Sequence, residues 1–293
     1  MKMAPTERYA SQRIANILGK SRLGIIAGTG PLPRQIAERF DPTGETIFFI
    51  ALEGITDPKT VFNFDHRWVK LGQLQIAIAA LLEAKVDKVV MAGPVKRPAL
   101  SSLKLDKRAS KMLWRGGTKI FGDDGLLSLL INEIEKDGLK VIGIDQILSD
   151  LLTEPNLNIG PYIDNVAQRD IDRAIEILVK LGPADVGQSV AIQEGLVLAV
   201  EAIEGTDEMI DRAGKYRRDA LGPILVKISK PGQERRADMP TIGPKTVRVA
   251  ISNGFRGLAL EEGGTLLVER DEVRKIAENA NFFIVSIKVP GAQ

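Results

Sequence analysis

Apolar residues in the first half of the chain form short, uninterrupted runs that alternate with segments of helical spacing. The runs are LGIIAG (23–28), TIFFIAL (46–52), KVVMAG (88–93) and KVIGI (140–144). Short continuous runs of this kind are typical of strands buried on both faces of a parallel sheet. Residues 72–84 and 124–138 instead repeat apolar positions every three or four residues, as amphipathic helices do. The pattern predicts an α/β domain with a doubly wound, Rossmann-like parallel sheet.

The pattern changes after a cluster of turn-forming residues at 153–161. Residues 165–183 have helical spacing, and two strand-like runs flank Gln193-Glu194-Gly195, which predicts a hairpin. Residues 205–216 predict a helix capped by Thr206 or Asp207. A strand within 223–231, a second hairpin within 256–270, a last helix and a strand at 282–289 follow. We therefore predict an N-terminal extension (1–22), a Rossmann-like domain (23–155) and a smaller α+β domain (156–293).

The N-terminal extension lacks the apolar core of a signal peptide. Its residues Tyr9, Ile14, Ile17 and Leu18 have near-helical spacing, which predicts a short surface helix. Nowhere does the chain approach the roughly 18 consecutive apolar residues of a transmembrane helix. We expect a soluble, cytoplasmic protein.

The composition restricts the chemistry. The chain of 293 residues has no cysteine and a single histidine, His66. Disulfides, thiolate catalysis, cysteine-ligated metals and two-histidine metal sites are therefore excluded. Any hydrolysis must depend on carboxylates, Lys, Arg, Ser and a recruited cation. The net charge of +2 gives no overall case for nucleic-acid binding.

The turn after the first apolar run resembles a nucleotide-binding fingerprint with one substitution. Gly28 and Gly30 occupy the first two glycine positions of G-x-G-x-x-G, but Pro33 occupies the third. Backbone amides of such a turn can bind phosphate, and Glu53 lies about where a ribose-binding acid would follow. The alternative is a tight turn that holds no ligand.

The GDDG turn at residues 122–125 also allows two interpretations. Asp123 or Asp124 could coordinate a cation, whereas an aspartate at the start of a helix commonly satisfies free backbone amides. We expect at least one of the two to cap the helix.

A basic segment runs from Lys96 to Lys119. It contains eight Lys or Arg residues and one acid, Asp106, with Leu113 and Trp114 among them. A solvated helix face would explain such a run. We favour contact with an anionic membrane surface, with Trp114 at the interface, or with a phosphate-rich ligand, because the total charge of the chain is so small.

The segment KISKPGQERRADMPTIGP (227–244) combines charges, glycines and prolines directly after a predicted strand. Lys230, Arg235 and Arg236 could neutralise phosphate oxygens. Glu234 and Asp238 could hold a divalent cation or orient water.

Several stretches together resemble the LpxI-type UDP-2,3-diacylglucosamine pyrophosphatases of lipid A biosynthesis. They are LGIIAGTGPLP, VVMAGPVKRP, GDDGLL, VGQSVAIQEGLVLAVEAIEGTDEMIDRAG and KPGQERRADMPTIGPKTV. The resemblance spans nearly the whole chain after about Arg22, and the last two stretches are the most specific. The family pattern in the last stretch reads approximately K-P-G-Q-D-x-R-x-D-x-P. This chain departs from it at Glu234, where the family has Asp, and matches it at Lys230, Pro231, Gly232, Gln233, Arg236, Asp238 and Pro240.

The resemblance implies a Rossmann-like domain followed by a distinct C-terminal domain, and hydrolysis of a pyrophosphate to UMP and 2,3-diacylglucosamine 1-phosphate. It implies Mg²⁺ as the cofactor, for which Mn²⁺ could substitute. The catalytic residues it implies are Asp238, Lys230 and Arg236. The substrate-binding residues are Gly28, Gly30, Gly93, Gln188, Gln193, Gln233 and Thr241. The metal ligands are Asp238, Asp207, Glu201 and Glu234, with Glu204 in the same stretch as a further candidate.

The implied partners are a lipid-linked nucleotide sugar and the inner membrane surface, with peripheral attachment. A homodimer is left open, and no nucleic acid is expected. Two other functions also stay open at this point. One is a nicotinamide-dependent oxidoreductase, suggested by the α/β half but disfavoured by Pro33. The other is a non-catalytic protein that binds a nucleotide sugar or a lipid.

Overall fold

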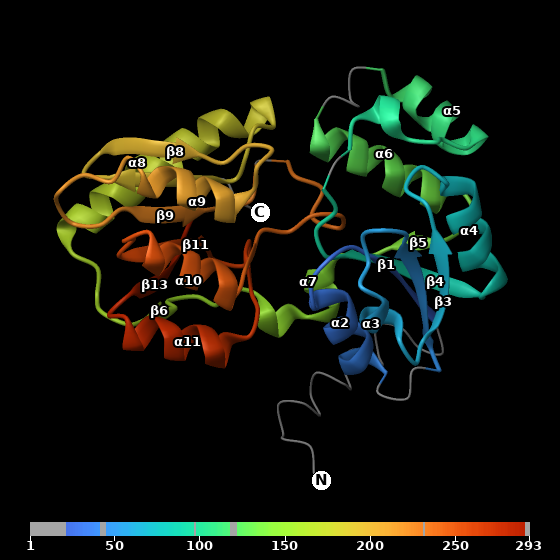
Figure 1. The fold of residues 1–293 in the computed structure, drawn as a ribbon, viewed down its shortest axis with the longest axis horizontal. Helices are drawn as coiled ribbons and strands as arrows, with labels where there is room; N and C mark the ends of the chain where they lie inside the picture. Colours follow the sequence, from blue (N-terminus) through green and yellow to red (C-terminus); the bar gives the residue numbers. More distant parts are fainter. Residues whose placement is uncertain (1–21, 42–44, 97, 118–121, 231, 291–293) are drawn as a thin grey trace, which may run out of the picture. The chain divides into compact units, whose positions relative to one another are not determined.

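The computed structural model describes residues 22–290, except 42–44, 97, 118–121 and 231 (Figure 1). The surface helix expected in the N-terminal extension lies outside the described residues. The chain divides into two compact units. Unit 1 comprises Met1–Asp150 and Glu234–Asp238, and unit 2 comprises Leu151–Gln233 and Met239–Gln293.

Unit 1 is built on a five-stranded sheet in which all pairings are parallel. The strand order is β3-β2-β1-β4-β5, which is the order of a doubly wound sheet. All four apolar runs predicted as strands contain one, although the last is a strand only at Lys140–Val141 and its Ile144 begins α7. The apolar pattern does not predict β3, an edge strand whose first three residues are exposed. The bounds are β1 (Arg22–Ala27), β2 (Ile47–Leu52), β3 (Asp65–Val69), β4 (Val86–Ala92) and β5 (Lys140–Val141).

Helices cover both sides of this sheet (Figure 1). One side is covered by α4 and α6, whose residues Ile78, Leu81, Ile131 and Ile134 form a core with the strands. On the other side α2 packs against β1. The predicted Rossmann-like domain is therefore confirmed. The bounds are α2 (Leu32–Phe40), α3 (Pro58–Val61), α4 (Leu74–Glu83), η1 (Leu100–Ser102), α5 (Lys107–Gly116), α6 (Asp123–Glu135), α7 (Ile144–Ile147) and η3 (Ser149–Leu151).

The carboxyl ends of β1 and β4 meet through backbone atoms. Gly28 N donates to Ala92 O at 2.8 Å, and Thr29 N donates to Pro94 O at 2.9 Å. A Cβ atom at Gly28 would lie 2.2 Å from the carbonyl oxygen of Gly93, and one at Gly93 would lie 2.3 Å from that of Thr29. Both positions require glycine because the two loops touch where the strand order changes direction.

Unit 2 contains a six-stranded mixed sheet in the order β6-β13-β11-β9-β7-β8. Strands β9, β11 and β13 are parallel to one another, whereas β6, β7 and β8 are joined by antiparallel pairings. Two short strands, β10 and β12, form a separate parallel pair. The bounds are β6 (Asn158–Ile159), β7 (Ser189–Gln193), β8 (Leu196–Val200), β9 (Ile224–Lys227), β10 (Thr241–Ile242), β11 (Gly257–Glu261), β12 (Leu266–Leu267) and β13 (Phe283–Ile287).

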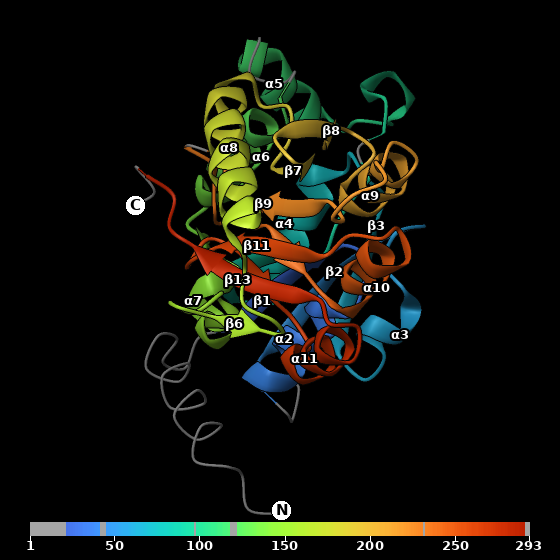
Figure 2. The same ribbon diagram turned by 90° about the vertical axis from the view of Figure 1, so that its left-hand side faces the viewer.

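The sheet of unit 2 has helices on both faces (Figure 2). Alternate strand residues face α8 on one side, for example Val190 and Val226. Their neighbours Ala191 and Leu225 face α9, α10 and α11 on the other side. This period of two is what a sheet buried on both faces requires. The bounds are α8 (Asn165–Leu181), η4 (Gly182–Ala184), α9 (Thr206–Gly214), α10 (Pro244–Ser252) and α11 (Arg270–Asn279).

The first predicted hairpin of unit 2 is confirmed as β7–β8. Its two turn residues, Glu194 and Gly195, have positive φ angles of 47° and 78°. The buried carboxylate of Asp170 accepts a hydrogen bond from each of their amides, at 2.9 and 2.6 Å. A side chain of α8 therefore fixes the turn.

Three local predictions are wrong. The second hairpin does not form, because β11 has parallel neighbours on both sides, β9 and β13, and β12 pairs with β10. The N-cap of α9 is Gly205 rather than Thr206 or Asp207, whose side chains bond to Glu201 and Thr246 instead. The N-cap of α6 is likewise a glycine, Gly122, so neither Asp123 nor Asp124 occupies the capping position expected for one of them.

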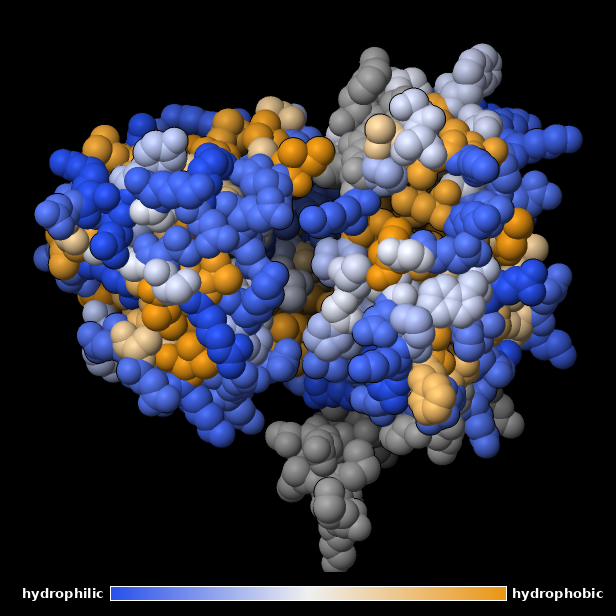
Figure 3. Space-filling view, in the orientation of Figure 1, coloured by the Kyte–Doolittle hydropathy of each residue, from blue (hydrophilic) through white to orange (hydrophobic). Residues whose placement is uncertain are grey.

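Among the described residues, no helix is long and apolar enough to cross a membrane. Hydrophilic side chains cover most of the surface visible in Figure 3, and apolar side chains form patches between them.

We predict that Gly28→Ala destabilises the protein by at least about 2 kcal/mol, because the new Cβ forces the two loops apart and breaks their hydrogen bonds. Gly30→Ala is the matched control. Gly30, unlike Gly28, has a positive φ of 83°, but a Cβ there meets no atom within 4 Å, so only the backbone strain of about 1 kcal/mol is expected. Thermal unfolding of both variants is the measurement, and equal losses would contradict the backbone contact.

Candidate functional site

The charged segment noted in the sequence begins at the carboxyl end of β9 and contributes to both units. Strand β9 ends at Lys227, and the chain remains part of unit 2 up to Gln233. Glu234–Asp238 belong to unit 1, and the chain returns to unit 2 at Met239.

In unit 2 the start of the segment is fixed through Lys230 and Gln233. The Lys230 ammonium forms an ion pair with Asp185, and only 11% of its side chain is exposed. The backbone N of Lys230 donates to Gln233 Oε1 at 2.9 Å, and Gln233 Nε2 donates to Gln188 Oε1 at 3.3 Å. The structure thus brings together three predicted site residues, Lys230, Gln188 and Gln233.

A buried polar cluster lies at the same edge of the sheet. Lys227 Nζ donates to Thr206 Oγ1 at 2.7 Å and Ser189 Oγ at 3.3 Å, and it pairs with Glu201 Oε2 at 3.5 Å. Thr206 Oγ1 in turn donates to Glu201 Oε1 at 2.7 Å. Lys227 and Glu201 are only 2% and 7% exposed. All three ammonium donors of Lys227 therefore have partners inside the protein.

The pKa of Glu201 lies below its ordinary value. Burial alone would raise this pKa, but the charge of Lys227 and the hydrogen bonds from the neighbouring hydroxyl groups outweigh it. Glu201 is therefore ionised at neutral pH and serves as the counter-charge of Lys227.

A second buried carboxylate holds the residue that precedes Lys230. Glu261, at the end of β11, is 3% exposed. Its Oε2 atom accepts a hydrogen bond from Ser229 N at 2.5 Å, and Ser229 Oγ donates to Gly264 O at 2.9 Å. The backbone leading to Lys230 is therefore attached to the turn that follows β11.

In unit 1 the segment is held by residues of α6. Glu234 N donates to Asp124 Oδ1 at 2.5 Å, which joins the GDDG turn to a residue 110 positions later. Arg236 donates twice to Glu234, from Nε to Oε1 at 2.9 Å and from Nη2 to Oε2 at 2.8 Å. Its Nη1 atom donates to Glu135 Oε1 at 3.0 Å.

These contacts shift the pKa values of Arg236 and Glu234. The hydrogen bond with Glu234 raises the pKa of Arg236, and the same bond lowers the pKa of Glu234. The two groups therefore stay charged and form a bidentate pair.

Asp238 ends a short turn of this segment. Its backbone N donates to Glu234 O at 3.2 Å, and Ala237 N donates to the same oxygen at 3.0 Å. Ala237 packs against the core beneath α4 and α6, while Asp238 is half-buried. The backbone position of Asp238 is thus set by its own hydrogen bond and by the packing and hydrogen bond of Ala237, the residue before it.

The four predicted metal ligands belong to different units. Glu234 and Asp238 lie in unit 1, and Glu201 and Asp207 lie in unit 2. Glu201 pairs with Lys227, Glu234 with Arg236, and Asp207 with Lys245. In the part of the chain that the structure describes, no three Asp, Glu or His side chains gather as a metal-binding group. The described carboxylates do not form a complete protein cage for an ion.

The remaining predicted binding residues occupy separate places. Gln193 lies at the opposite end of β7 from Ser189, and its amide bonds three times to the backbone of Arg218 and Leu221. Thr241 Oγ1 donates to Met239 O at 3.0 Å, directly after the Glu234–Asp238 turn. Gly28 and Gly93 lie where the loops after β1 and β4 of unit 1 touch. Through its three hydrogen bonds, Gln193 holds the turn at 218–221.

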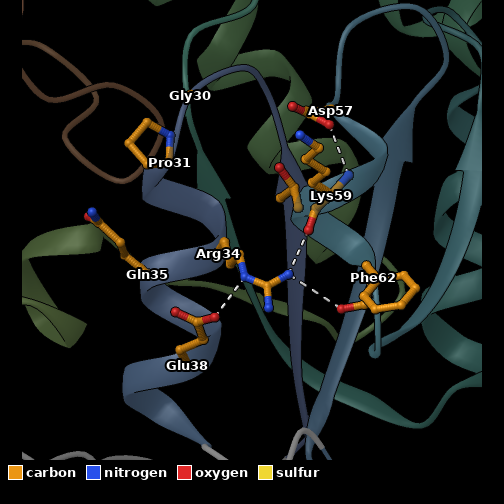
Figure 4. A pocket seen from close by; sticks show the side chains of 9 residues that line it. Gly30, Pro31, Arg34, Gln35, Glu38, Asp57, Lys59 and Phe62 are labelled. Carbon is orange, nitrogen blue, oxygen red and sulfur yellow. Dashed lines mark hydrogen bonds and ion pairs between the residues drawn. The ribbon is translucent and has the colours of Figure 1, made fainter.

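Gly30 lines a groove between α2 and α3 of unit 1, with a volume of about 600 Å³ (Figure 4). The sequence pattern did not identify this groove. Its lining is Gly30, Pro31, Arg34, Gln35, Glu38, Asp57, Lys59, Thr60 and Phe62.

Sequence reasoning also did not assign a role to Lys227, Glu261 or Asp185. The first two each follow an apolar run, where a charged residue normally marks the emergence of a strand into water. Their burial depends on neighbouring elements of the sheet. Asp185 is brought to Lys230 by the turn after η4, in which it adopts a left-handed conformation with φ 51°.

The basic segment forms helix α5 and the residues before it. Lys104, Lys107, Lys111 and Arg115 are exposed, and 85% of Trp114 is exposed. Arg108 instead faces α6, where it pairs with Glu133 and Asp137. Arg108 therefore joins two helices, whereas Lys104, Lys107, Lys111 and Arg115 are on the surface.

Comparisons with known proteins agree over most of the chain. The model of the LpxI N-terminal domain matches residues 22–151, and that of the LpxI C-terminal domain matches residues 160–285. The UDP-2,3-diacylglucosamine pyrophosphatase LpxI of Caulobacter vibrioides is 34% identical over 278 residues, which is 91% of this chain and 97% of that protein. The similarity includes both units and the charged segment.

We predict that Glu201→Gln destabilises the protein by about 3–5 kcal/mol, because it leaves the buried Lys227 without its counter-charge. Adding Lys227→Met should recover much of the loss, since the pair is then removed as a whole. The matched control is Glu176→Gln, whose exposed carboxylate bonds Lys180 and Arg173 and should matter far less. Chemical denaturation is the measurement, and a loss no larger than that of the control would contradict a structural ion pair.

The pH dependence follows from the direction of the pKa shift. Because the pKa of Glu201 is lower in the folded protein, its stabilising contribution is complete above the ordinary glutamate pKa. The contribution is lost as the pH falls through the lowered folded-state value. The destabilisation caused by Glu201→Gln should therefore shrink in acid.

Proposed function

The chain belongs to the LpxI family of UDP-2,3-diacylglucosamine pyrophosphatases, and from this premise we propose that it hydrolyses the pyrophosphate of UDP-2,3-diacylglucosamine. The products are UMP and 2,3-diacylglucosamine 1-phosphate, in lipid A biosynthesis. The observation that carries the proposal is the convergence of separate family stretches on one charged segment. Asp124 of the GDDG turn contacts Glu234, and Gln188 contacts Gln233.

Lys230 and Arg236 are proposed to bind the phosphate oxygens. Each is already held by carboxylates, Lys230 by Asp185 and Arg236 by Glu234 and Glu135. Their charges are therefore positioned before substrate arrives, which reduces the reorganisation needed as charge develops in the reaction. A phosphate group would compete with these carboxylates for the same N–H donors. Asp238 is proposed to orient the attacking water.

We also propose that the reaction requires Mg²⁺, with Mn²⁺ as a substitute. The oxygen donors of Asp238 and Glu234 suit a hard cation, and the chain offers no cysteine ligand. Mg²⁺ is commonly held by one or two carboxylates together with substrate phosphates, so the lack of a cage among the described residues is compatible with such a site. When bound, the cation would neutralise charge on the pyrophosphate. Glu201 and Asp207 are secondary candidates because each is engaged by a lysine.

Two rival functions make different predictions. A nicotinamide-dependent oxidoreductase should bind NAD, and a non-catalytic binding protein should bind a UDP-sugar without turnover. The contact between Gly28 and Gly93 accounts for those glycines without a dinucleotide. Neither rival is named by the comparisons.

The direct test is incubation of the protein with UDP-2,3-diacylglucosamine and Mg²⁺, followed by mass spectrometry of the products. We predict that Asp238→Asn lowers kcat at least ~100-fold, about 2.7 kcal/mol, with a smaller effect on substrate affinity. It should also raise the Mg²⁺ concentration that gives half of the maximal rate. The reason is that the amide keeps the shape of the side chain but removes the charge that acts on water or the cation.

Asp172→Asn, on the exposed face of α8, is the matched control and should keep the parent rate. Glu234→Gln should cost less than Asp238→Asn, because its amide oxygen can still accept one hydrogen bond from Arg236 and because that position already differs from the family pattern. A folded Asp238→Asn variant with the parent kcat would remove Asp238 from the mechanism.

We further propose that the exposed face of α5 attaches the enzyme to an anionic bilayer surface. The substrate carries two acyl chains, so an enzyme acting on it gains from a position at the membrane. Lys107 and Lys111 of α5, with Lys104 shortly before the helix, supply positive charge, and the exposed indole of Trp114 suits the interface.

Reversal of Lys104, Lys107 and Lys111 to Glu should weaken binding to anionic vesicles at least ~10-fold, because each cation contributes about 1 kcal/mol near such a surface. Arg108 is left intact because its loss would disturb the pairing of α5 with α6. The control reverses three exposed lysines of unit 2, namely Lys180, Lys275 and Lys288. Equal vesicle binding by the two triple variants in a sedimentation assay would rule out a specific role for α5.

A further inference from the structure

The groove between α2 and α3 lies entirely within unit 1, beside the carboxyl ends of β1 and β2. Gly30 follows β1, and residues 57–62 follow β2. In doubly wound sheets, ligands bind outside the carboxyl ends of the strands. The volume of about 600 Å³ is within the range of small-molecule sites, roughly 300–1,000 Å³. Position and size therefore both suit a ligand.

Arg34 forms the middle of the groove and connects the two helices (Figure 4). Its Nε atom donates to Glu38 at 2.6 Å, and its Nη1 atom donates to Lys59 O at 2.6 Å and more weakly to Phe62 O at 3.4 Å. The ring of Phe64 lies 5.6 Å from the guanidinium carbon. Because Arg34 is fixed from both sides, the groove is a defined feature of unit 1.

Two exposed side chains of the groove have properties that a nucleotide requires. The Phe62 side chain is 66% exposed, and it stands at the outer rim of the groove (Figure 4). An exposed aromatic ring is a surface on which a base can stack. Lys59 is exposed and, among the described residues, has no carboxylate within ion-pair distance. Its ammonium group is suited to an anionic oxygen.

The lining disfavours the other half of the proposed substrate. Five of the nine lining residues are charged or carry an amide, and Phe62 is the only large apolar side chain among them. Acyl chains bind where several apolar side chains enclose them, and one phenylalanine at the rim of an open groove does not form such an enclosure.

We infer that the groove binds the uridine monophosphate part of the substrate, with uracil stacked on Phe62 and the phosphate facing Lys59. This inference rests on the proposed function for the identity of the base. Phe62 and Lys59 are then binding residues and not catalytic residues. Their interactions are the same in the ground state and the transition state, so they affect KM rather than kcat.

The test is a titration of the full-length protein with UMP by isothermal calorimetry, together with steady-state kinetics on UDP-2,3-diacylglucosamine. Phe62→Ala should weaken UMP binding about 5- to 100-fold, the range expected for one lost base–aromatic stack. KM should rise by a similar factor while kcat stays near the parent value. Lys59→Gln should weaken UMP more than uridine.

Tyr162→Ala is the matched control, since Tyr162 is an aromatic residue of unit 2 with 89% exposure. It should leave both UMP binding and KM unchanged. Equal UMP affinity in the parent and Phe62→Ala proteins would overturn the inference, as would no UMP binding by the parent. If UMP binds in a Phe62-dependent manner but no substrate is hydrolysed, the groove assignment stands and the proposed function fails.

Discussion

The bidentate pair between Arg236 and Glu234, extended by the bond from Arg236 to Glu135, decides where the charged segment lies. A loop that leaves a strand edge with this many charges would ordinarily be solvated and mobile. Here Arg236 bonds both within the segment and to α6, and Asp124 takes the Glu234 amide. The proposed catalytic carboxylate, Asp238, is two residues further on. Its location therefore depends on an electrostatic contact between residues about one hundred positions apart.

The other end of the segment depends on burial rather than on exposed charge. Lys227 and Glu261 are polar residues inside the sheet of unit 2, and each is compensated by partners that only the folded chain supplies. Burying such groups costs free energy unless their hydrogen bonds are made, so the cluster tolerates few alternative arrangements. Lys230 follows directly and is held by Asp185. An enzyme that must stabilise negative charge gains from cations fixed in this way, because they need not reorganise during the reaction.

The sequence alone predicts those parts of the fold that local patterning determines. Strands such as 46–52 and 88–93 are continuous in apolar residues because both of their faces are covered, and that pattern is visible without a structure. The edge strand β3 carries Asp65, His66 and Arg67, so it has no such pattern. The second hairpin was wrong because the neighbours of β11 come from distant segments. In the same way, the sequence motifs identify Lys230, Gln188 and Arg236 as candidates, but their partners Asp185 and Glu135 depend on the tertiary fold.

The altered glycine fingerprint has a physical explanation in unit 1. In a dinucleotide site the third small residue lets the helix pack closely on the strand. Here Pro33 is buried in the first turn of α2, and its Cγ atom lies 3.2 Å from where a Cβ of Gly93 would be. Pro33 therefore packs on the neighbouring loop, and Gly28 and Gly93 allow the two loops to touch. The space that a dinucleotide turn leaves for pyrophosphate is partly filled by the protein itself.

Gly30 is different, because a Cβ there meets nothing within 4 Å. Open space beside this turn therefore begins at Gly30 and continues along α2, on the side where Arg34 and Lys59 lie.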